Sequence, residues 1–126
     1  MSRPAIPADL RRFIVLAIPS VPYLEALLLM RSAGSTGLNA GSLAGALYVN
    51  HKTAAALLDQ LKAAALIELA PAPAEGHYCY APSADHAPLI DQLAAEYANN
   101  LVGVSMLIHS SGMKESAEGV QYRGKS

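Results

Sequence analysis

The stretch Leu38–Leu69, with the sequence LNAGSLAGALYVNHKTAAALLDQLKAAALIEL, decides the fold. It holds two runs of apolar residues at three- and four-residue spacing, which is the period of an amphipathic helix. We expect helices over Ala40–Tyr48 and His51–Ala65, each preceded by an asparagine that suits the N-cap position. Because the break at residues 48–50 is so short, the two helices must cross rather than lie antiparallel. The stretch therefore predicts a helix-turn-helix over about residues 39–65.

The hydrophobic pattern changes its period directly after the second of these helices. Leu66–Leu69 alternates between apolar and polar positions as a strand does, and His77–Ala81 alternates again. The segment between them, Pro71–Gly76, has the composition of a turn. The sequence therefore predicts a β-hairpin, or wing, over about residues 66–81.

Helices are also expected on both sides of this central region. Upstream, Ala8–Ala17 is amphipathic and Val21–Arg31 is almost wholly apolar, and a Gly-rich loop over residues 32–37 follows. Downstream, we expect a helix that keeps Pro88 in its first turn, a break, and a last helix over residues 101–108. The expected fold class is mainly α with a small β-hairpin: a helix-turn-helix followed by the hairpin, with flanking N- and C-terminal helices.

Length and composition bound the class of protein. A chain of 126 residues has room for one domain. We place that domain at residues 1–109, and we expect residues 110–126, where no hydrophobic period survives, to form a mobile tail. With 52% hydrophobic and 15% charged residues, the chain is outside the composition of disordered proteins.

Cysteine usage and hydropathy bear on the compartment. Cys79 is the only cysteine, so no internal disulfide can form, and the sequence favours a reducing, cytoplasmic location. The most apolar stretch, residues 13–30, is interrupted by Pro19, Pro22 and Glu25, so we expect no membrane span there.

The order of helices, turn and hairpin resembles the winged-helix superfamily of bacterial regulators, which includes MarR- and PadR-type proteins. Two segments carry the resemblance: LNAGSLA at Leu38–Ala44, where the second helix of that fold begins, and LLDQLKAAALIEL at Leu57–Leu69. The same scaffold serves DNA binders, RNA binders and protein adaptors, so the resemblance implies a fold more than a function.

If the regulators' function carries over, the helix His51–Ala65 enters the major groove of DNA. On a helical wheel its apolar stripe leaves a polar and alanine-rich side opposite. The residues we expect to contact DNA are, on this helix, Lys52, Thr53, Ala56 and Gln60, and, on the N-terminal helix, Arg11 and Arg12.

The charge pattern weakens this expectation. The whole chain carries a net charge of -1, and the region Leu38–Pro82 has fewer basic than acidic residues. Phosphate neutralisation supplies most of the non-specific affinity for DNA, so we expect modest binding of duplex DNA in transcription regulation. The alternative is a winged-helix protein-protein interaction module that binds no DNA.

The amphipathic helices at both ends of the chain predict a homodimer. Together they have more apolar surface than a domain this small can cover by itself. The side chains expected at a two-fold interface are Leu10, Phe13, Ile14, Ile90, Leu93 and Tyr97, together with those of the helix over residues 101–108.

No motif points to catalysis or to a cofactor. The sequence has no Gly-rich phosphate loop, no HExxH and no CxxC, so we expect no enzyme, no catalytic residues and no cofactor. His77, Cys79 and His86 offer three soft ligands in a short segment, but their spacing matches no closed metal site. We therefore expect no metal, and Cys79 is expected to be structural.

Overall fold

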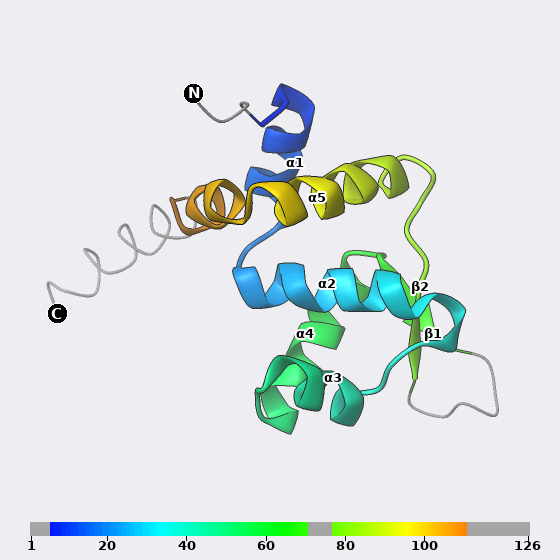
Figure 1. Cartoon of the computed structure of the whole chain (residues 1–126). Coiled ribbons are helices and arrows are strands. Elements are labelled where there is room, and N and C mark those ends of the chain that lie inside the picture. The colour runs from blue at the N-terminus through cyan, green and yellow to red at the C-terminus, as the bar shows by residue number, and fades with distance from the viewer. Residues whose placement is uncertain (1–5, 71–76, 111–126) are drawn as a thin grey trace, which may run out of the picture. The chain divides into compact units, whose positions relative to one another are not determined.

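The fold is mainly helical, with one small antiparallel sheet, in a computed structural model that describes residues 6–70 and 77–110. The elements, in chain order, are α1 (Ala8–Ala17), α2 (Val21–Ala33), the 3-10 turn η1 (Gly34–Thr36), α3 (Ala40–Leu47), α4 (His51–Ala63), β1 (Ile67–Leu69), β2 (Tyr78–Tyr80), α5 (Ala87–Asn99) and a last helix at Leu101–Ser110 (Figure 1). The expected turn at residues 71–76 and the expected tail beyond residue 110 lie outside the described residues.

The chain divides into two compact units. One unit is Pro22–Pro88, and the other joins Met1–Val21 with Leu89–Ser126. We call them the central unit and the terminal unit. The sequence predicts a single domain over residues 1–109, with no boundary between these two units. That single domain stays a prediction.

Asparagine side chains begin the two central helices, as the sequence predicted. Asn39 Oδ1 accepts the backbone N–H of Ser42 at 2.8 Å, and Asn50 Oδ1 accepts that of Thr53 at 2.7 Å. Each bond satisfies one of the amide groups that the first turn of a helix leaves without a partner. The predicted starts of α3 and α4 are therefore confirmed.

Both central helices end earlier than expected, and each ends in a left-handed residue. Tyr48 follows α3 with φ 59°, and Ala65 follows α4 with φ 62°. The next amide then folds back onto the helix: Val49 N–H donates to the Ala44 carbonyl and Leu66 N–H to the Leu61 carbonyl, both at 3.1 Å. The prediction that α4 continues to Ala65 was wrong, because this residue lies past the helix end and is exposed.

The hairpin forms as predicted, and a third segment joins it. β1 pairs antiparallel with β2 in the register Ile67↔Tyr80, Glu68↔Cys79 and Leu69↔Tyr78. On the other edge of β2, Leu38 and Tyr78 exchange two backbone hydrogen bonds of 2.9 Å each. This bridge was not predicted, and it ties the segment before α3 to the sheet.

A glycine makes this bridge sterically possible. Gly37 has φ +75°, and a Cβ built on it would lie 2.5 Å from the Tyr78 carbonyl oxygen. Only a residue without a side chain allows the two backbones to approach so closely. The expected loop over residues 32–37 is instead the end of α2 followed by the 3-10 turn η1, which contacts β2.

The core of the central unit is made of aliphatic side chains from α2, α3 and α4. Leu24, Leu27, Met30, Leu43 and Leu61 are each 0% exposed. Within this unit α3 packs against α4, and α4 contacts β1 (Figure 1). The almost wholly apolar sequence of α2 therefore supplies Leu24, Leu27 and Met30 to this core. Burial raises the pKa of the α2 phenol, Tyr23, above its ordinary value.

The terminal unit buries one face of each of its helices. The buried side chains are Leu10, Phe13 and Ile14 of α1, Ile90 and Leu93 of α5, and Val104 and Ile108 of the last helix. Asn100 separates α5 from the last helix, and its side-chain Oδ1 accepts the Gly103 N–H at 3.1 Å. The predicted break before Leu101 is therefore confirmed.

Across residues 6–70 and 77–110, no single helix is both long and apolar enough to cross a bilayer. Only α1 and α2 taken together reach the required length, and the chain bends between them.

Candidate nucleic-acid interface

The face of α4 that we expected to meet DNA lies in solvent. Lys52, Thr53, Ala56 and Gln60 are all exposed. The opposite side of the helix is buried through Ala54, Leu57, Leu58 and Leu61, and none of these four side chains is more than 6% exposed. The helical period of the sequence therefore predicted correctly which side of α4 faces outward.

Both ends of α4 are attached to neighbouring elements of the central unit. Before it, the turn at residues 48–50 connects it directly to α3, and Asn50 caps its first turn. After it, Leu66 and Ile67 are buried and lead into β1, which α4 contacts. The exposed face therefore belongs to a helix fixed at both ends, which is the arrangement that a rigid reading element needs.

Charge is unevenly distributed along α4. The sequence contains no Asp or Glu between Ala26 and Leu58, so the first half of α4 carries Lys52 without an acidic neighbour on its own helix. Asp59 is the first acidic residue, and it lies about 10 Å further along the helix axis at about 1.5 Å per residue. The first half of the helix is therefore the end that suits a phosphate backbone.

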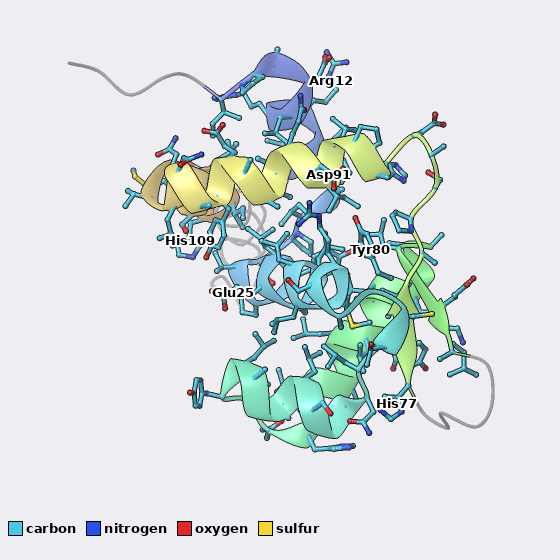
Figure 2. The ribbon with its side chains drawn as sticks, turned by 45° about the vertical axis from the view of Figure 1, so that its right-hand side comes forward. Arg12, Glu25, His77, Tyr80, Asp91 and His109 are labelled. Atoms are coloured by element: carbon cyan, nitrogen blue, oxygen red, sulfur yellow. The ribbon has the colours of Figure 1, made fainter. Side chains whose placement is uncertain are left out.

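The two arginines expected to assist are on a different unit. Arg11 and Arg12 are exposed on α1, and Figure 2 shows the Arg12 side chain extending away from that helix. Their exposure fits the solvated face of an amphipathic helix. Arg11 and Arg12 belong to the terminal unit, whereas Lys52 belongs to the central unit.

The side chains expected at a dimer interface belong to the chain's own core. Five of the six are buried, namely Leu10, Phe13, Ile14, Ile90 and Leu93, and Tyr97 is half-buried. An amphipathic face predicts that apolar residues are covered, and here a single chain covers them. The large apolar side chains that the terminal unit leaves exposed are Val15, Leu16, Leu101, Val102 and Met106.

The hairpin offers no metal geometry in the part of the chain that the structure describes. His77 and Cys79 are half-buried on β2 and just before it, and Figure 2 shows His77 beside the end of the hairpin. His86 lies in the turn before α5, where its Nδ1 is 3.3 Å from Ser83 Oγ. Within residues 6–70 and 77–110, no three His, Cys, Asp or Glu side chains converge.

One residue next to the α4 face was not singled out from the sequence. Tyr48, in the turn between α3 and α4, is 94% exposed, more than any other large apolar side chain described. The signal that could have found it is the shortness of the break, since so tight a turn between helices needs a left-handed residue.

No family model, curated protein or solved structure matches this chain. The function is therefore inferred from the residues and their geometry.

Proposed function

We propose that the central unit is a winged-helix module that binds duplex DNA with modest affinity, in transcription regulation, through the first half of α4. The observation that carries this proposal is the exposed, acid-free beginning of α4, with Lys52, Thr53 and Ala56 outward and the helix held by the α3–α4 turn. A helix so presented is what the major groove accommodates, and its N-terminal residues are those that reach base edges.

The sheet supports the same proposal. A winged helix places a short strand before its helix pair and two more strands after it, and this chain has the Leu38 bridge before α3 and the pair β1–β2 after α4. β2 lies between Leu38 and β1, so the segment before the helix pair and the hairpin after it form one framework around α3 and α4.

The affinity is expected to be low because few cations are available. Lys52 and Lys62 are both exposed on α4, and Asp59 lies between them. The first test is fluorescence anisotropy of the purified full chain with a random duplex, from tens of millimolar salt upward. We expect a slope of log affinity against log salt of about -2 if Lys52 and Lys62 alone neutralise phosphates, and of about -4 if Arg11 and Arg12 take part as well.

Variants locate the contact on α4. Lys52→Ala is expected to make that slope shallower by about one, and Asp59→Asn to strengthen non-specific binding because it removes a charge that repels phosphate. On a sequence selected for binding, Gln60→Ala is expected to cost about 1–3 kcal/mol at a single base position. Absence of binding at tens of millimolar salt, for both the natural chain and Asp59→Asn, would overturn the proposal.

The second candidate function is protein contact through the same unit. It is favoured by the small, uncharged side chains that line the exposed surface of the two helices, namely Gly41, Gly45 and Ala46 on α3 and Ala56 and Ala63 on α4. Such a surface lets another backbone approach closely. A stable complex with a protein partner, disrupted by Ala56→Glu in a chain that does not bind DNA, would select this candidate.

We further propose that the chain is a homodimer formed through exposed residues of the terminal unit. Leu16 is 78% exposed on α1, and Leu101, Val102 and Met106 are each more than half exposed on the last helix. That helix carries no Asp, Glu, Lys or Arg, so two copies of its face do not repel each other. A dimer also suits DNA, since paired modules bind paired half-sites.

A further inference from the structure

Tyr48 has two unfavourable features, a left-handed backbone and an exposed aromatic ring, that the fold of this chain does not explain. Its backbone is left-handed, with φ 59° and ψ 44°, a conformation that favours glycine or asparagine over a bulky residue. Its side chain is 94% exposed, so the phenol ring contributes almost no burial in return. The turn requires the left-handed backbone, but nothing in the packing of the described chain requires a tyrosine there.

The residues near Tyr48 in the sequence indicate the chemistry of a partner that its ring could contact. It directly precedes the capped beginning of α4, where His51, Lys52 and Thr53 are all exposed. The acid-free stretch of sequence between Ala26 and Leu58 includes this turn, so no carboxylate on the neighbouring chain segments opposes an anion. An exposed phenol four residues before an exposed lysine, with no acidic residue nearby in sequence, suits a partner that presents both an apolar surface and anionic oxygens.

We propose that Tyr48 binds the backbone of duplex DNA, its hydroxyl donating a hydrogen bond to a phosphate oxygen and its ring packing against the adjoining deoxyribose. Tyrosine is among the side chains that make such positioning contacts, which fix the orientation of a protein on DNA without reading its sequence. With its backbone fixed by the turn, Tyr48 sets how the first half of α4 approaches the groove. This inference rests on the proposed DNA binding.

The experiment measures anisotropy of the full chain with random duplex DNA across a salt series. Tyr48→Phe removes only the hydroxyl, and we expect about threefold to tenfold weaker binding, the worth of one hydrogen bond. The salt slope should stay unchanged, because a neutral donor releases no counterion, whereas Lys52→Ala should change it. Tyr48→Gly removes the ring as well and should weaken binding by about tenfold or more.

A matched control separates backbone strain from contact. Ala65 is the other non-glycine residue with positive φ in the described chain, and it is exposed at the far end of α4. Tyr48→Gly and Ala65→Gly each remove the side chain from a residue with a left-handed backbone, which relieves steric strain. Both variants should therefore have a higher midpoint of thermal unfolding, but only Tyr48→Gly should weaken DNA binding.

The outcomes are distinguishable from failure of the proposed function. If the natural chain binds no DNA, the proposed function and this inference both fall. If the natural chain binds and both Tyr48 variants bind within about twofold of it, the inference alone is overturned. If Tyr48→Gly binds weakly and Tyr48→Phe binds normally, the phosphate contact is likewise overturned, because only the ring then contributes.

Discussion

Ala65 shows how a single left-handed residue limits the stability of the central unit. It has φ 62°, and it occupies the position after a helix where glycine is the common residue. We expect Ala65→Gly to increase the free energy of unfolding by up to about 1 kcal/mol, because glycine adopts this conformation without a steric cost. Urea denaturation followed by circular dichroism measures the change.

The neighbouring alanine is the control. Ala64 has φ -83°, which an alanine adopts without strain, and it is exposed as well. Ala64→Gly should lower the free energy of unfolding by about 0.5–1 kcal/mol, since glycine there adds only freedom to the unfolded chain. Equal effects at both positions would contradict the role assigned to the backbone of Ala65.

Ala65 also shows which part of α4 could not be predicted from the sequence. The apolar period of α4 identified the buried stripe from Ala54 to Leu61, because packing against a core leaves a repeating pattern. A helix end is normally marked by glycine or asparagine, and here three alanines in succession, residues 63–65, carry no such mark. The outward face of the candidate site was therefore predictable, whereas the end of its helix was not.

At the scale of elements, Gly37 controls the attachment of the sheet to the helix pair. It combines a positive φ with the close approach of the Tyr78 carbonyl. Gly37→Ala should therefore break the Leu38 bridge and lower the free energy of unfolding by about 2 kcal/mol or more. Equilibrium urea unfolding gives the size of the loss.

Gly45 provides a matched glycine in the middle of α3. A Cβ at this position meets nothing within 4 Å, and the residue is exposed. Gly45→Ala should stabilise the chain by about 0.5–1 kcal/mol, the difference in helix propensity. If both glycine-to-alanine changes are tolerated equally, the Leu38 bridge does not depend on Gly37.

Helices were predictable at this scale and the extra sheet segment was not. Each helix repeats its pattern over several turns, and α1 has the bounds that its period predicted, Ala8–Ala17. The bridge at Leu38 involves one residue, so it leaves no alternation to detect. The glycine pair at Gly34 and Gly37 was interpreted as a loop by composition, although its positive φ angles serve the 3-10 turn and the bridge.

At the scale of the whole molecule, an amphipathic face predicts that its apolar residues are buried, but not whether the same chain or a second copy buries them. The sequence correctly marked Phe13 and Leu93 as residues to be buried, and the chain itself buries them. Burial within a chain and burial between chains produce the same apolar pattern, so only exposure shows which apolar residues remain for a dimer surface. That surface combines Leu16, which lies on the polar side of α1, with Leu101, Val102 and Met106 of the last helix.

Association of the chain provides the last prediction. Leu16→Glu and Met106→Glu add a charge to side chains that are 78% and 65% exposed, so each variant should fold normally and sediment as a monomer at micromolar concentration. Phe13→Glu instead places a carboxylate in the core, at a side chain only 7% exposed, and should unfold the protein rather than dissociate it. Analytical ultracentrifugation with circular dichroism separates these results. A natural chain that sediments as a monomer would remove the homodimer, and a dimer that survives both exposed substitutions would move its interface away from α1 and the last helix.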